Sequence, residues 1–144
     1  MTGVAITGYA SLFGQRDGAG DIVRPGAFRA TLARRRARGI AMLWQHDPFR
    51  PIGMWTGMAE DHRGLRVTGR LLQSVAQGRE AAALIAAGAL TGLSIGFKAR
   101  KARRGRDGRS RILFDIDLWE VSLVTFPQVE GARVRLLTNS STVS

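Results

Sequence analysis

The first half of the chain alternates short apolar runs with turn-forming residues. Residues 4–13 carry apolar side chains at about every second position, which predicts a strand. A turn rich in Gly and Asp follows at 14–21. Residues 27–38 have apolar side chains four apart and a glycine directly after them, which predicts a helix. Residues 40–44 then predict a short apolar strand.

The second half repeats these two periodicities. Residues 52–59 and 65–72 alternate on either side of a polar, Gly-containing turn, which predicts a hairpin. Residues 74–87 form an alanine-rich helical segment whose first residue, a serine, is expected to cap it. Residues 93–99 and 112–124 alternate again and predict two further strands.

These elements predict a mainly β fold with peripheral α-helices. Neighbouring strands are joined mostly by turns, and no β–α–β repeat is evident. We therefore expect an antiparallel β-barrel of about six or seven strands with two or so helices around it. A chain of 144 residues fits one domain of this kind.

The composition excludes several kinds of binding site and bears on where the protein is located. The chain has no cysteine, which excludes disulfides and thiolate metal sites. No apolar run approaches the roughly 20 residues of a membrane-spanning helix, and the first residues lack the layout of a signal peptide. We expect a soluble, cytoplasmic protein.

The positive charge is concentrated in one segment. The formal net charge is +11, and residues 98–111 hold eight basic residues against one acid, Asp107. Such a segment attracts polyanions, either nucleic acid or an acidic protein. Its composition predicts a mobile surface loop that folding does not need. The basic residues are Lys98, Arg100, Lys101, Arg103, Arg104, Arg106, Arg109 and Arg111.

One short motif suggests nucleophilic chemistry. Residues 92–96 read Gly-Leu-Ser-Ile-Gly, the G-x-S-x-G pattern of a nucleophile elbow. In the α/β-hydrolase fold a helix follows this serine and a histidine comes later in the chain. Here a strand follows Ser94 and no histidine does, so that fold is excluded. A triad on an unrelated fold is not, because the same geometry recurs with other chain orders.

A serine hydroxyl needs a base, and only two histidines are available. His46 ends a predicted strand beside a turn, where a side chain can reach a cleft. His62 lies in a hairpin turn, where exposure to solvent is the simpler interpretation. For His46 and Ser94 alike, an ordinary polar residue at a strand end or in a barrel wall stays an alternative.

Glu120 is the candidate for the carboxylate that orients the base. It lies between Trp119 and Val121 in an apolar strand, where a charged group needs a partner. On physical grounds alone, a salt bridge to one of the many arginines is the simpler explanation. Asp115 and Asp117 alternate with apolar residues and are expected to face water.

A metal site is a poor alternative, because two histidines without cysteine would need carboxylates to complete it and no H-E-x-x-H is present. No phosphate-binding or dinucleotide-binding loop is present either, so we expect no cofactor.

Five blocks, in order, resemble the prohead (capsid maturation) serine protease family of tailed phages, which has relatives in gene transfer agents. They are Gly-Tyr-Ala-Ser-Leu-Phe-Gly at 8–14, Asp-Ile-Val-Arg-Pro-Gly-Ala-Phe at 21–28, Leu-Trp-Gln-His-Asp with Pro-Ile-Gly at 43–53, Gly-Ala-Leu-Thr-Gly-Leu-Ser-Ile-Gly-Phe at 88–97 and Trp-Glu-Val-Ser-Leu-Val-Thr-Phe-Pro at 119–127.

The resemblance implies a fold similar to the herpesvirus capsid protease (assemblin) and a serine endopeptidase with a Ser-His-Glu triad. Ser94 would attack, His46 would act as base and then acid, and Glu120 would orient His46. Residues 1–137 would be a single protease domain and residues 138–144 a flexible polar tail. The implied substrate is scaffold protein or the scaffold-like leader of the major capsid protein, cut inside the immature capsid (prohead) in the bacterial host cytoplasm.

Two other functions stay open at this stage. A basic β-barrel could bind nucleic acid through residues 98–111 without sequence preference, although aromatic residues for stacking are few. A capsid-assembly protein could also keep the fold without the activity. Self-association into a homo-oligomer is left open, and no contact with a membrane is expected.

Overall fold

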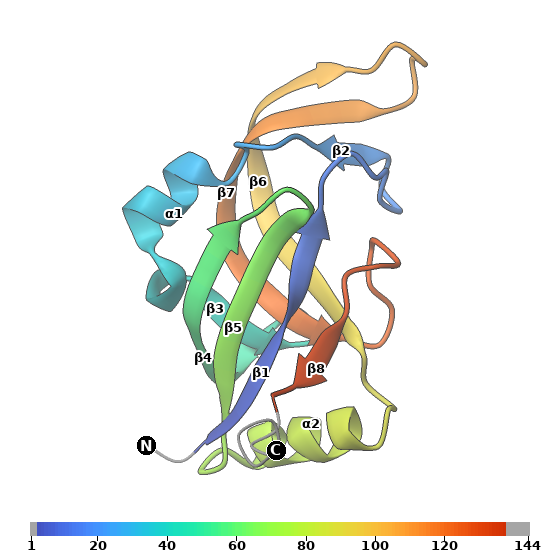
Figure 1. Ribbon diagram of the computed structural model, residues 1–144. Coiled ribbons are helices and arrows are strands. Elements are labelled where there is room, and N and C mark those ends of the chain that lie inside the picture. Colours follow the sequence, from blue (N-terminus) through green and yellow to red (C-terminus); the bar gives the residue numbers. More distant parts are fainter. Residues whose placement is uncertain (1–2, 138–144) are drawn as a thin grey trace.

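The structure, a computed structural model, describes residues 3–137. It is built mainly from β-strands with two α-helices and one short 3₁₀ helix (Figure 1). The strands are β1 (Gly3–Leu12), β2 (Asp21–Val23), β3 (Ala41–Trp44), β4 (Asp47–Glu60), β5 (Gly64–Leu72), β6 (Gly92–Arg104), β7 (Arg111–Val124) and β8 (Val134–Leu136). The helices are α1 (Arg29–Arg35), η1 (Ala37–Gly39) and α2 (Ala76–Ala86).

All the described strands join one curled sheet. Its order is β2-β7-β3-β4-β5-β1-β8, with β6 on β7. An isolated bridge between Gly92 and Arg133 connects the start of β6 with the approach to β8, so the sheet curls far enough for its ends to touch at one point. The prediction of a mainly β fold with peripheral helices is confirmed.

The strictly antiparallel arrangement that we expected is wrong. Strands β2 and β3 both run parallel to β7, while the other pairs are antiparallel. The sheet is therefore mixed, and it forms a half-barrel. Parallel pairing became possible because long connections return the chain to β7 from distant parts of the sequence, and local alternation carries no information about such pairs.

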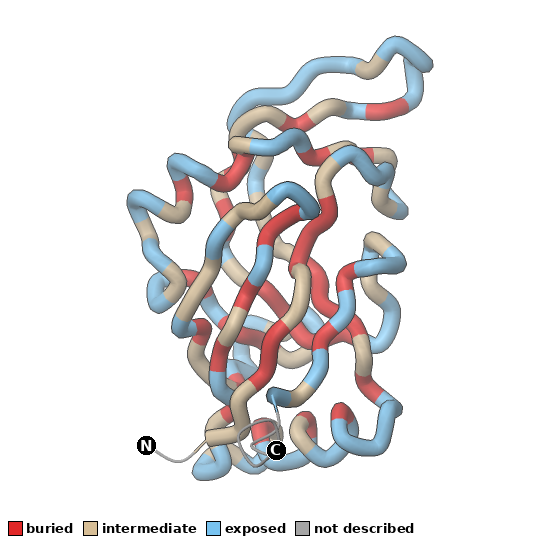
Figure 2. Tube along the Cα trace, viewed as in Figure 1, coloured by how far each residue is buried: buried red, intermediate tan, exposed pale blue. Residues whose placement is uncertain are grey.

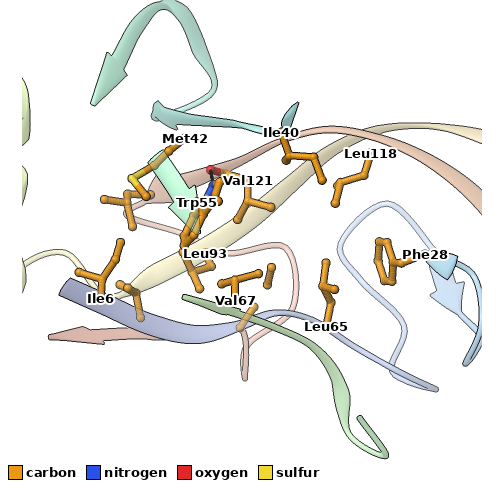
Figure 3. Close-up of a cluster of buried hydrophobic side chains, with 14 of the residues drawn as sticks. Ile6, Phe28, Ile40, Met42, Trp55, Leu65, Val67, Leu93, Leu118 and Val121 are labelled. Carbon is orange, nitrogen blue, oxygen red and sulfur yellow. Dashed lines mark hydrogen bonds between the residues drawn. The ribbon is translucent and has the colours of Figure 1, made fainter. Parts of the chain in front are cut away.

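The core lies inside the curl of the sheet. Side chains from β1, β3, β4, β5, β6 and β7 meet there with Phe28, which precedes α1 (Figure 3). Trp55 is fully buried in this cluster and its indole Nε1 donates a hydrogen bond to the Val121 carbonyl at 3.2 Å. This contact ties β4 to the middle of β7, the strand that also carries Glu120.

The helices are shorter than their sequence patterns predicted. The segment predicted as one helix at 27–38 breaks into α1 and η1 at Arg36, which has a positive φ of 59°. Helix α2 begins at Ala76 with Val75 as its N-cap and no side-chain cap, so the expected cap at Ser74 is wrong. Gly78 allows α2 to pack closely against β4, because a Cβ at this position would lie 2.9 Å from the Ile52 carbonyl oxygen.

Residues 98–111 do not form the loop that we expected. Strand β6 runs to Arg104 and β7 begins at Arg111, so only a six-residue turn at 105–110 separates them. The β6–β7 ladder continues to the Arg104–Arg111 pair. This hairpin projects from the body of the molecule (Figure 1) and is largely exposed (Figure 2). Charge alone suggested a loop, but the strand pairing and the contacts of the Arg24 and Arg103 guanidinium groups with the Phe114 ring outweigh it.

Candidate active site

His46 lies in the two-residue turn between β3 and β4. Trp44 pairs with Asp47 across this turn, and Gln45 and His46 adopt positive φ values of 51° and 62°. Two successive left-handed residues are the geometry of a tight hairpin turn, and glycine or asparagine usually occupies it. Non-glycine residues stay there only when their surroundings hold them.

Strand β7 supplies those surroundings. It runs beside β3, and its Leu123 carbonyl accepts a 2.9 Å hydrogen bond from the Gln45 N–H. The Gln45 side-chain amide donates to the Thr125 hydroxyl at 2.8 Å and accepts from the Thr125 N–H at 3.2 Å. The His46 N–H donates to the Ser122 hydroxyl at 3.1 Å. Four hydrogen bonds thus hold the turn to the end of β7 and to Thr125, the residue after it.

The imidazole of His46 bridges the other two predicted site residues. Its Nδ1 lies 2.9 Å from Glu120 Oε2, and its Nε2 lies 3.0 Å from Ser94 Oγ. We assign the ring proton to Nδ1, because the carboxylate can only accept, which leaves Nε2 to accept the Ser94 hydroxyl proton. The His46 side chain is 41% exposed, so solvent reaches the site from this side.

The pairing of β6 with β7 places Ser94 and Glu120 on one face. In this ladder Ser94 lies opposite Ser122, and Gly96 lies opposite Glu120. Side chains two apart on a strand share a face, so all four positions face the same way. His46 reaches this face from the neighbouring turn. The three residues come from three separate strands or turns that the sheet brings together.

Ser122 and Gly96 hold the carboxylate in place. The Ser122 hydroxyl donates to Glu120 Oε1 at 2.5 Å while it accepts from the backbone of His46. Gly96 leaves an open space that the Glu120 side chain fills. A Cβ built on Gly96 would lie 2.5 Å from Glu120 Cδ and 2.6 Å from Cγ, so only glycine fits beneath this carboxylate.

The electrostatics favour a protonatable imidazole. The hydrogen bond to Glu120 raises the pKa of His46 above its ordinary value, partial burial opposes this shift, and the charge of Glu120 adds to it. An imidazolium at this position is therefore stabilised by the carboxylate beside it. Such a ring is suited to take and return a proton near neutral pH.

The other candidate residues lie elsewhere. His62 is exposed in the β4–β5 turn, as its position suggested. Asp47 bonds to the Phe49 N–H and pairs with Arg50 rather than with His46. Asp117 and Asp115 are less exposed than we expected, because each pairs with arginine: Asp117 with Arg34 and Arg35, and Asp115 with Arg100. The arginine partners keep the pKa of Asp117 well below its usual range.

Sequence reasoning missed the supporting residues. Ser122 and Gly96 were each two positions from a candidate, on the same face of the same strand, and that spacing could have identified them. Gln45 and Thr125 had no such signal, because these two residues lie 80 positions apart in the sequence. Among residues 3–137, no group of three or more potential metal ligands gathers, and no helix is long and apolar enough to cross a membrane.

A small hollow with a volume of about 30 Å³ lies beside Ser94. It is bounded by β6, by the end of β1 and by the segment at 128–129. Apolar side chains such as Leu93 and Phe97 form part of its wall, and the polar groups of Asp17 and Gln128 form another part.

Comparison with known proteins agrees with this architecture. The chain is similar to the protease of Kaposi's sarcoma herpesvirus (KSHV) crystallised with a hexapeptide phosphonate inhibitor, at a TM-score of 0.66 and 14% identity over 99% of this chain and 68% of that one. The capsid assembly protease of bacteriophage T4 gives a TM-score of 0.64 at 13% identity, over 85% of this chain and 83% of that one. At such low identity these likenesses show the fold alone, and they confirm the expected herpesvirus-protease-like fold.

Sequence relatives are closer. The prohead protease of Enterobacteria phage HK97 is 37% identical over 129 residues, which is 88% of this chain and 57% of that protein. The prohead protease of Escherichia phage T5 is 30% identical over 125 residues, 86% of this chain and 58% of that protein. The chain thus spans less than three-fifths of the length of these relatives. A family model described as caudovirus prohead serine protease matches residues 1–143, so this chain belongs to the caudovirus prohead serine protease family.

Proposed function

We propose that this chain is a serine endopeptidase in which Ser94, His46 and Glu120 form the catalytic triad. The hydrogen-bonded chain from Ser94 Oγ through the imidazole to the Glu120 carboxylate carries the proposal. Both bonds lie within the 2.6–3.2 Å range required of a nucleophile and its base. The salt bridge to an arginine that was the simpler role for Glu120 is not its contact here, since its partners are His46 and Ser122.

In the proposed mechanism each group has one task. Ser94 Oγ attacks the scissile carbonyl carbon while its proton moves to His46 Nε2. The imidazolium then gives this proton to the leaving amine, the C–N bond breaks, and the acyl group stays on Ser94. A water molecule, deprotonated by His46, hydrolyses the ester and frees the enzyme. Glu120 keeps the ring oriented and stabilises its positive charge in both halves of the reaction.

The substrate that family membership favours is scaffold protein or the scaffold-like leader of the major capsid protein. Both sequence relatives are named prohead proteases, and a structural relative is a capsid assembly protease. The cleavage would take place inside the prohead, in the cytoplasm of the bacterial host.

Two measurements test the proposal. Ser94→Ala should abolish labelling by a serine-reactive fluorophosphonate, and it should slow cleavage of the capsid and scaffold proteins encoded with this chain by about 10⁴-fold or more. His62→Ala is the matched control and should behave as wild type, because His62 is exposed and far from the triad in the fold. Fragments would be identified by mass spectrometry.

The outcomes separate the competing functions. Cleavage that persists at the wild-type rate in Ser94→Ala would refute the nucleophile. Wild-type protein that neither reacts with fluorophosphonate nor cuts these proteins inside assembled proheads would instead favour a capsid-assembly protein that keeps the fold without the activity.

A further inference from the structure

The hairpin at residues 98–111, here called the arginine hairpin, is the most highly charged feature of the molecule. It comprises the end of β6, the turn at 105–110 and the first residue of β7, and it extends beyond the sheet (Figure 1). It holds eight basic residues and one acid. Most of its length is exposed to solvent (Figure 2).

Most of this charge has no ionic partner. Within residues 3–137, only Arg100 and Arg111 of its basic residues form ion pairs, with Asp115 and Asp21 respectively. Asp107 stabilises the turn at 105–110, because its carboxylate accepts hydrogen bonds from the Ser110 hydroxyl and from backbone N–H groups. These bonds lower the pKa of Asp107 to about 2. Its one ion pair among residues 3–137 is a 3.7 Å contact with Arg16. The remaining cations are Lys98, Lys101, Arg103, Arg104, Arg106 and Arg109.

The strand ladder brings like charges together. Arg104 and Arg111 lie directly opposite each other at the last pair of the β6–β7 ladder. Asp21 balances the charge of Arg111, whereas Arg104 has no ion pair among residues 3–137. A bound anion at the end of the hairpin would balance the charge that is left.

Two observations favour an acidic polypeptide over nucleic acid. Phe114, the aromatic residue next to the arginine hairpin, is covered by Arg24 and Arg103, whose guanidinium carbons lie 5.4 and 4.9 Å from the ring centre. These guanidinium groups lie over the ring and compete with a base for it. The arginine hairpin is also continuous with the strand that carries Ser94, so a polypeptide laid along β6 from the scissile bond would reach it.

We propose that the arginine hairpin is a secondary binding site for an acidic segment of the protein substrate, a proposal that rests on the endopeptidase function above. Arg103 lies nine positions after Ser94 in β6, a span of about 30 Å at the usual rise of a strand. An extended substrate needs on the order of nine residues to cover it. The acidic segment therefore lies roughly ten residues or more from the scissile bond and leaves the bond itself free to enter the site.

Binding can be measured without cleavage. The whole chain with Ser94→Ala would be titrated against a fluorescent peptide of twelve glutamates, a matched peptide of twelve glutamines, and a DNA duplex of the same net charge, with anisotropy as the readout. We expect the acidic peptide to bind, the neutral peptide not to bind, and affinity to fall with added salt. Binding of duplex that is tighter than binding of the acidic peptide would overturn the proposal and make this a nucleic-acid surface.

A pair of charge variants locates the site. The hairpin variant replaces exposed cations that have no ion pair among residues 3–137 and leaves Arg103 to cover Phe114. Its affinity for the acidic peptide should fall at least about tenfold. The control variant removes the same charge from other surfaces and should lose no more than about twofold. The hairpin variant is Lys101→Gln, Arg104→Gln, Arg106→Gln and Arg109→Gln; the control is Arg29→Gln, Arg36→Gln, Arg38→Gln and Arg66→Gln.

Equal losses in the two variants would show an effect of net charge alone and would overturn the site. With Ser94 restored, the hairpin variant should keep wild-type fluorophosphonate labelling while it cuts the co-encoded capsid or scaffold protein about tenfold more slowly. Unchanged cleavage would refute the role in substrate binding. If the wild-type protein were not labelled at all, the endopeptidase function itself would be refuted. Failure of the binding site and failure of the proposed function therefore give different results.

Discussion

Gly96→Ala adds one methyl group at the point where the Glu120 side chain crosses β6. The new Cβ would lie 2.5 Å from Glu120 Cδ and 2.6 Å from Cγ, where ordinary contacts begin at 3.4 Å. The backbone of Gly96 needs no left-handed conformation, so the cost is one of space alone. The carboxylate is the mobile partner, and it must retreat by about 1 Å, a displacement that can reduce a rate about 100-fold.

This retreat breaks the geometry on which His46 depends. The bond from Nδ1 to Glu120 Oε2 is 2.9 Å, and an added ångström takes it beyond hydrogen-bond range. We expect the second-order rate of fluorophosphonate labelling of Ser94 to fall about 100-fold, less than on loss of the serine itself. The fold should survive with a loss of about 1–3 kcal/mol in the free energy of unfolding, measured by urea denaturation.

Gly57→Ala is the matched control. Gly57 is also a strand glycine without a positive φ, but a Cβ there has nothing within 4 Å. It should label as wild type and unfold at nearly the same urea concentration. If Gly96→Ala labelled at the wild-type rate, then the space over Gly96 would not be what positions Glu120, and the argument from the close contact would fail.

Three smaller tests concern the same group of side chains. Glu120→Gln should keep the fold and a small residual activity. Because this change removes the main cause of the raised His46 pKa, the acidic limb of the pH–rate profile should move to lower pH. An acidic limb that stays in place would contradict the pairing of His46 with Glu120. Ser122→Ala should reduce labelling by about tenfold or more, since a hydrogen bond to a charged group contributes roughly 1.5–3 kcal/mol, and Ser122→Thr, which keeps the hydroxyl, should recover part of it. Thermal unfolding from pH 5 to 9 should show the His46–Glu120 contribution complete below the ordinary pKa of histidine and lost as pH rises through the raised value; Glu120→Gln should remove this dependence.

The sequence predicted the elements of the fold better than their arrangement. Alternation along residues 65–72 and 112–124 identified strands that the structure contains as β5 and β7. It could not show that β3 runs parallel to β7, because a parallel pair is joined only by tertiary contacts. Yet that pair brings the His46 turn to Glu120. The geometry of the site therefore depends on the part of the fold that local pattern does not encode.

In the arginine hairpin the predicted secondary structure itself was wrong. A run of like charges with glycines is typical of a solvated loop, and the sequence was interpreted that way. Strand propensity prevailed because the partner strand offers apolar and acidic positions. Ala102 lies opposite Leu113 and Lys101 lies opposite Asp115, so most of this stretch of β6 faces apolar or acidic residues, and only its last pair joins two arginines. Composition described the surface of this segment correctly but not its backbone.

Strand β7 organises the candidate site more than any of the three triad residues does. Gln45 and His46 hold left-handed conformations that cost non-glycine residues about 1–3 kcal/mol each. Hydrogen bonds that these two residues donate to Ser122, Leu123 and Thr125 offset this cost. The same strand carries Glu120, two residues before Ser122. The carboxylate that orients the imidazole and the groups that fix its backbone are therefore parts of one rigid element, and the imidazole has little freedom to leave the line between Glu120 and Ser94. For the proposed endopeptidase, such preorganisation would make the rate depend on the arrival of substrate rather than on rearrangement of the site.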